Sequence, residues 1–215
     1  MNASAPRHLV SASRWLRYLP QCSAGNRLNG FTVLELMVVL AIAAILVALA
    51  VPSLTQVVRI NTMASTVNTF LADMRYARSE SIRRGGGVVM CRSGNPEAVN
   101  AACNSDATIG WETGWIIFHD LDNDGARVPA EQVLRAHAPT ATVNTILAVG
   151  KASVFGFTAT GRLSLPATLQ LQFGSSPVYA ADVQRTVCIN PGGYARVAID
   201  NDGRPTGSAS CSTGP

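Results

Sequence analysis

The sequence has few charged side chains, and they are unevenly distributed. Only 14% of the residues are Asp, Glu, Lys or Arg, and Lys151 is the single lysine. No Asp or Glu precedes Gly30, whereas four of the 17 basic residues do, which leaves 13 against the 13 acidic residues. The part after Gly30 is therefore formally neutral and lacks the broad positive field of a nucleic-acid-binding protein. The net charge of +4 belongs to the first 30 residues.

The sequence also lacks the short motifs of common enzymes. It contains no G-x-S-x-G, H-E-x-x-H or Walker sequence, and no cysteine has an evident catalytic partner. His119 and His137 are better explained as structural or surface residues than as catalysts. We therefore predict that the protein is not an enzyme and uses no organic cofactor.

Five cysteines are present, at positions 22, 91, 103, 188 and 211. There is no C-x-x-C pair and the histidines are scattered, so disulfides in an oxidising compartment are favoured over the alternative of a zinc site. Four cysteines after position 30 allow three pairings. Proximity in the sequence favours Cys91–Cys103 and Cys188–Cys211.

A long apolar run extends from Phe31 to Val51 and ends at Pro52. A helix of this length crosses a hydrocarbon core of about 30 Å, and the preceding arginines would keep the leader in the cytoplasm. The run has the composition of a membrane anchor, and Ala48-Leu49-Ala50 would also suit signal peptidase. Neither interpretation explains Glu35, because a carboxylate in hydrocarbon costs about 2.5–3.5 kcal/mol or more and is a functional hypothesis by default.

The remaining sequence predicts an α+β domain. Apolar residues recur at three- and four-residue steps over residues 53–86, which predicts an amphipathic helix that the three glycines at 85–87 end. Short β-like runs then alternate with Gly, Pro, Asn and Asp clusters. These runs are 88–92, 115–120, 133–138, 153–159, 167–173, 185–190 and 194–200. We expect a leader over 1–30, a membrane helix over 31–52, the amphipathic helix over 53–86 and a β-rich domain over 87–215.

The string G-F-T-V-L-E at 30–35, with the apolar run and Pro52 behind it, resembles the class III signal of type IV prepilins and type II secretion pseudopilins. The resemblance implies cleavage between Gly30 and Phe31 by a prepilin peptidase, followed by N-methylation of Phe31. It also implies a type IV pilin-like fold, in which a long N-terminal helix, half transmembrane and half amphipathic, packs on an antiparallel sheet. In this family the residue at Glu35 pairs with the new amine of a neighbouring subunit, so Glu35 and Pro52 are expected in the assembly helix.

The segments 71–93, 110–125 and 131–135 are similar to the GspH/FimT group of minor pilins and pseudopilins. This similarity implies a low-copy subunit that primes or caps a type IV pilus or a type II secretion pseudopilus. Its expected place is the inner membrane, crossed once, with the C-terminal domain in the periplasm and other minor pilins or pseudopilins as partners. The alternative is a DNA-binding minor pilin used in natural transformation, for which Arg185, Arg196 and Arg204 are candidate contacts, although the second arginine of the family's Gly-Arg-x-Arg element is missing.

One acidic segment matches the calcium loop of EF-hands. Asp120, Asp122, Asp124 and Glu131 satisfy the pattern D-x-[DN]-x-[DN]-G-x5-E. The flanks argue against an EF-hand, because WIIFH is strand-like and Pro129 precedes no clear helix. The segment is therefore a candidate for calcium outside an EF-hand, and its alternative is a long hairpin turn whose Asp side chains bond local backbone amides.

Overall fold

The computed structural model describes residues 30–140, 142–164, 168–199, 206–207 and 211, and only the backbone of 51–53. It divides into two compact units, Met1–Val47 and Ala48–Pro215. The predicted leader, apart from Gly30, lies outside the described residues, as do Cys22 and Arg204.

The helix α1 (Val33–Arg84) begins just after Thr32 and continues through Pro52 without a break. It ends, as predicted, at the three glycines. Gly85, Gly86 and Gly87 have φ of 80°, 115° and 63°, a region that favours glycine, and the amide of Gly86 donates to the carbonyl of Ser81. These three residues turn the chain from the helix into the first strand.

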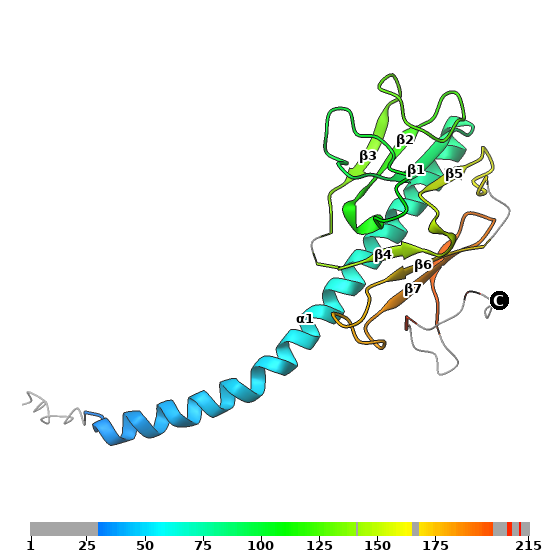
Figure 1. Cartoon of the computed structure of the whole chain (residues 1–215). Helices are drawn as coiled ribbons and strands as arrows, with labels where there is room; N and C mark the ends of the chain where they lie inside the picture. The colour runs from blue at the N-terminus through cyan, green and yellow to red at the C-terminus, as the bar shows by residue number, and fades with distance from the viewer. Residues whose placement is uncertain (1–29, 141, 165–167, 200–205, 208–210, 212–215) are drawn as a thin grey trace, which may run out of the picture. The chain divides into compact units, whose positions relative to one another are not determined.

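Two antiparallel sheets follow the helix. Sheet 1 has the order β3-β2-β1-β5 and sheet 2 the order β4-β6-β7-β8. Figure 1 shows both along the second half of α1, with sheet 1 nearer the end of the helix. The strands of sheet 1 are β1 (Val88–Arg92), β2 (Trp115–His119), β3 (Val133–His137) and β5 (Val154–Phe157). Those of sheet 2 are β4 (Ile146–Ala148), β6 (Leu169–Phe173), β7 (Arg185–Ile189) and β8 (Ala195–Val197). The α+β class predicted from the sequence is confirmed.

One hydrophobic core joins α1 to both sheets. It combines buried helix residues with Met90 and Trp115 of sheet 1 and with Leu171 and Val187 of sheet 2. The helix contributes Met63, Val67, Phe70, Leu71, Met74 and Ala77. Phe70 lies at the centre, because its ring makes edge-on contacts with Trp111 at 5.8 Å, Trp115 at 5.4 Å and Phe173 at 5.5 Å. Such aromatic pairs add about 0.5–1.5 kcal/mol each to the burial of their surface.

The strand β4 is the one strand that the sequence did not predict. It has three residues, and its edge is held by Glu112 of the 3-10 helix η1 (Trp111–Thr113). The amide of Ile146 donates to Oε2 of Glu112 at 2.7 Å, and the amide of Gly110 donates to Oε1 at 3.0 Å. The Glu112 carboxylate thus accepts a hydrogen bond at the edge of β4. The strand itself is too short to show a periodic pattern in the sequence.

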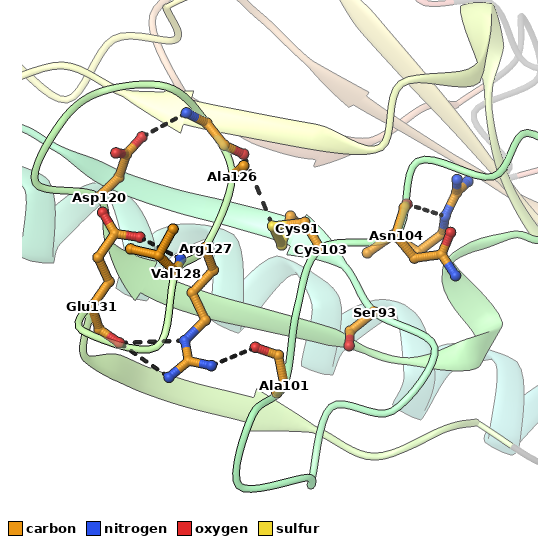
Figure 2. The surroundings of a disulfide bond; sticks show 12 residues. Cys91, Ser93, Ala101, Cys103, Asn104, Asp120, Ala126, Arg127, Val128 and Glu131 are labelled. Carbon is orange, nitrogen blue, oxygen red and sulfur yellow. Dashed lines mark hydrogen bonds between the residues drawn. A yellow bond between two sulfur atoms is a disulfide. The ribbon is translucent and has the colours of Figure 1, made fainter.

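The second face of sheet 1 is covered by loops. Val89, Cys91, Ile116 and Phe118 point to this face and pack against Ala101 of the loop after β1. The disulfide Cys91–Cys103 fixes that loop, and Cys188–Cys211 fixes the C-terminal segment to β7, so the structure contains both pairings that sequence proximity favours. Figure 2 shows the first disulfide among the loop residues that surround it.

Arg92, which follows Cys91 in β1, organises the same loop. Arg92 is 3% exposed, and its guanidinium donates to the carbonyls of Asn104 (3.2 Å), Asp106 (2.5 Å) and Ile109 (2.7 Å). Burial lowers the pKa of Arg92, while the nearby carboxylates of Asp106 and Glu112 raise it. The loop therefore closes around a buried cation that is bonded to backbone oxygens.

A buried carboxylate ties α1 to sheet 1. Asp73 is 3% exposed, and its two oxygens accept hydrogen bonds from Trp115 Nε1 at 2.8 Å and from the Arg135 guanidinium at 2.7 Å. The Arg135 guanidinium also lies 4.2 Å from the ring centroid of Tyr76. Because Trp115 is in β2 and Arg135 in β3, one side chain of the helix fixes two strands.

We expect Asp73→Asn to lower the free energy of unfolding by about 1–3 kcal/mol, because the amide offers one acceptor for two donors and leaves Arg135 without its carboxylate. The measurement is thermal and urea unfolding of the full chain in detergent. Glu97→Gln makes the same charge change at an exposed position and should unfold like the wild type. Equal stability of the two variants would contradict this role of Asp73.

Candidate processing and assembly site

The predicted processing site lies directly before α1 and is open to its surroundings. Gly30, Phe31 and Thr32 precede the first helical residue, and Phe31 is 80% exposed. A Cβ built on Gly30 would have no atom within 4 Å. The Gly30–Phe31 peptide bond is thus accessible in the structure.

Thr32 starts the helix. Its Oγ1 accepts a hydrogen bond from the Glu35 amide at 3.2 Å, and its carbonyl accepts the first intrahelical bond, from the Leu36 amide at 3.1 Å. This is the N-cap geometry, in which a side-chain oxygen satisfies one of the four free amides of the first turn. Thr32 was not among the site residues predicted from the sequence, although Thr-x-x-Glu at 32–35 is the capping-box pattern and could have identified it.

Glu35 is an exposed carboxylate on an apolar helix surface. Its neighbours Val33, Leu34 and Leu36 are 77%, 75% and 55% exposed. None of the ion pairs formed within the described part of the chain involves Glu35. Its position in the first turn is favourable for the helix dipole, but that interaction leaves the carboxylate itself open to a partner from outside the chain.

The first part of α1 is long and apolar enough to cross a membrane. The mean hydropathy of its most apolar window is 2.9, and none of that window is buried within the protein. The exposed apolar surface also continues past Pro52, because Leu54, Val57 and Val58 are 64%, 50% and 55% exposed. The sequence predicted an amphipathic helix from residue 53, but the buried stripe begins only at Ile60 and Met63. The surface open to another molecule is therefore longer than the membrane run.

The acidic loop between β2 and β3 is stabilised by its own backbone. Asp120 accepts the amides of Asn123 and Gly125, at 2.7 and 2.9 Å, and Glu131 accepts those of Leu121 and Val128, at 2.7 and 3.0 Å. Burial raises the pKa of Asp120, and the hydrogen bonds from the amides of Asn123 and Gly125 oppose that shift. Arg127 links the loop to the disulfide-bonded loop through the carbonyl of Ala101 at 2.6 Å (Figure 2).

The same contacts bear on the calcium prediction. One oxygen from each of Asp120, Asp122 and Asp124 lies within 4.8 Å of the others, whereas Glu131 is not part of this group. Both oxygens of Glu131 instead accept hydrogen bonds from backbone amides. This is the geometry of the alternative to a calcium site, a hairpin turn in which acidic side chains bond local amides. Calcium binding stays a prediction from the sequence.

Two of the three arginines proposed for DNA binding lie among the described residues, and both are half-buried. Arg185 is half-buried and donates to the carbonyls of Asp182 and Gln184, Arg196 is half-buried in β8, and Arg204 lies outside the described residues. Near the end of α1, Arg83 and Arg84 bond to Glu80 and lower its pKa to about 2.

His137 packs against an aromatic residue of sheet 1. Its ring stacks on Trp115 with centroids 4.1 Å apart, and burial lowers its pKa against the opposing effect of Asp73.

We expect Glu131→Gln to lower the free energy of unfolding by about 1–3 kcal/mol in buffer containing a chelator, because one of the two amides that bond to the buried Glu131 carboxylate loses its acceptor. Thermal unfolding of the full chain, with and without millimolar calcium, is the measurement. A variant that differs from the wild type only when calcium is present would instead establish Glu131 as a metal ligand. The exposed Glu97→Gln, outside the acidic loop, provides the matched control.

Two family models match the chain. The model described as type II transport protein GspH matches residues 66–193, and the prokaryotic N-terminal methylation motif matches residues 26–51. No match was found among curated proteins. The second model covers Gly30, Phe31, Thr32 and Glu35, which are the residues that form the site described above.

Among solved structures, two crystal forms of the type IV minor pilin FimU from Pseudomonas aeruginosa PAO1 are similar. The P21 form has 19% sequence identity and a TM-score of 0.49, covering 69% of this chain and 95% of that one. The P65 form has 20% identity and a TM-score of 0.47, covering 69% and 97%. The GspH model, by contrast, extends over more than half of the chain, from the second half of α1 to the turn before β8. With its N-terminal methylation motif, its apolar helix and its antiparallel sheets, this chain belongs to the GspH family of type IV pilin-like proteins.

Proposed function

We propose that the chain is the precursor of a minor pilin or pseudopilin that primes or caps a type IV pilus or a type II secretion pseudopilus. The observation that carries this proposal is an exposed apolar helix with an unpaired Glu35 in its first turn, directly after an accessible Gly30–Phe31 bond. The precursor crosses the inner membrane once. Its β-rich domain lies in the periplasm, where the two disulfides form.

Processing gives Glu35 a partner. A prepilin peptidase hydrolyses the Gly30–Phe31 bond, so that water supplies the hydroxyl of the new Gly30 carboxylate and a proton to the Phe31 amine, which is then N-methylated. The methylated amine remains a cation near the membrane boundary. Since an unpaired carboxylate is costly beside hydrocarbon, Glu35 of one subunit pairs with the Phe31 amine of a neighbour, and this pairing sets the register of the packed helices.

The exposed surface over Phe31–Val58 is the contact with neighbouring pilin-like subunits. It combines the membrane run with Leu54, Val57 and Val58 beyond Pro52. In the membrane the first part contacts lipid, whereas the last three residues would face water unless another subunit covers them. Their exposure supports assembly through the helix.

DNA binding has less support from the structure. The described arginines near the C-terminus are half-buried. Near the end of α1, Arg83 and Arg84 are paired with Glu80, and the Arg78 guanidinium lies 3.9 Å from the ring centroid of Tyr194. The formally neutral domain adds no general attraction for phosphate.

We expect Glu35→Gln to leave leader removal within about twofold of the wild type and to reduce incorporation into the filament about tenfold or more. Tenfold corresponds to about 1.4 kcal/mol. Glutamine preserves the capping-box pattern with Thr32, so this substitution removes the charge and keeps the helix start. Glu35→Ala should impair incorporation as well.

The measurement compares processed and filament-associated protein in cells that express the partner subunits, with Glu97→Gln as the control for loss of an exposed charge. Normal incorporation of both Glu35 variants would refute the pairing. Tagged wild-type protein, cross-linked and purified from the same cells, identifies the filament through its partner subunits.

A further inference from the structure

We propose that Thr32 positions the Gly30–Phe31 bond for the prepilin peptidase by ending the helix before the bond is reached. This inference rests on the processing proposed above. It adds a role for a side chain that does not itself touch the reacting atoms, and it follows from where α1 begins and from which groups bond to Thr32.

Nothing in the composition of the apolar run itself marks the start of the helix. Phe31, Val33 and Leu34 are all compatible with a helix, and the exposed surface is continuous across them. The distinguishing feature is Thr32, whose Oγ1 accepts the Glu35 amide at 3.2 Å. At an N-cap the backbone is not helical, so this hydrogen bond ends the helix at a defined residue.

Without the cap the helix can gain hydrogen bonds by growing toward the leader. The next bonds in an α-helix would join the amide of Glu35 to the carbonyl of Phe31 and the amide of Leu34 to the carbonyl of Gly30. Water that could otherwise satisfy these amides is scarce beside hydrocarbon, so an uncapped end favours this growth more strongly than it would in solution.

Growth of the helix would engage the carbonyl that must react. Hydrolysis requires the scissile carbonyl oxygen to be free, because the negative charge that develops on it must be stabilised by donors of the peptidase. The carbonyl of Gly30 is the acceptor that the Leu34 amide would occupy. Thr32 therefore keeps the carbonyl of Gly30 free to react. It also keeps Phe31, which carries the new amine after cleavage, outside the helix.

The test uses the full chain reconstituted with prepilin peptidase in phospholipid vesicles. Thr32→Val has the shape of threonine but cannot accept a hydrogen bond, whereas Thr32→Ser and Thr32→Asn keep an acceptor and differ in shape. We expect kcat/KM for leader release to fall about fivefold for Thr32→Val and to stay within about twofold for Thr32→Ser and Thr32→Asn.

A second measurement reports the helix start independently of cleavage. In vesicles without peptidase, hydrogen exchange of the amides of residues 33–36 should be altered in Thr32→Val and unaltered in Thr32→Ser and Thr32→Asn. Wild-type rates for Thr32→Val would overturn the inference. Cleavage of Thr32→Asn as slow as that of Thr32→Val would also overturn it, because the peptidase would then require the threonine side chain itself and not an acceptor at the N-cap. Failure of the wild type to be cleaved at Gly30–Phe31 would instead refute the processing itself.

Discussion

The domain depends on how one helix is fixed to two sheets, and the hydrogen bonds of Asp73 are the directional part of that attachment. Phe70 and its aromatic neighbours provide the larger area of contact, but apolar packing does not by itself select one rotation of a helix about its axis. Asp73 bonds to side chains from β2 and β3, so it selects the rotation that places Phe70 under the sheets. A buried carboxylate with two donors is tolerated because both of its oxygens are satisfied.

The same helix carries a second carboxylate in the opposite situation. Glu35 lies on an apolar surface and has no ion-pair partner within the described chain, whereas Asp73 has two donors. The two carboxylates therefore lie in parts of α1 that have different roles. Its second half completes a folded domain, and its first half exposes an apolar surface that is long enough to cross a membrane. The exposed Leu54, Val57 and Val58 show that this apolar surface reaches beyond Pro52.

Much of this organisation is predictable from the sequence because it depends on strong local signals. The three glycines at 85–87 end α1 where the pattern predicts, and the short apolar runs Val88–Arg92 and Trp115–His119 form two buried strands. The string at 30–35 likewise indicates the processing site. These features depend on residues close together in the chain, where periodicity and turn chemistry operate.

Features that depend on distant partners were not predictable in the same way. β4 exists because Glu112 holds its edge, and the apolar spacing at 54–58 is the same whether or not a sheet lies against it. The enclosure of Arg92 by three loop carbonyls is another such feature, because no local pattern in the sequence indicates it. Thr32 is different, since its capping pattern was present in the sequence but was obscured by the stronger signal of Glu35.

The burial of Arg92 has a consequence for the environments that the domain can tolerate. A histidine or lysine in the same position would lose its proton as the medium became alkaline, and the carbonyls around it would lose their donor. A guanidinium stays protonated in proteins, so the enclosed loop keeps its anchor over the whole range of pH in which bacteria live. With the disulfide Cys91–Cys103 beside it, the loop is fastened by one covalent bond and one permanent cation, and neither depends on the acidity of the surroundings.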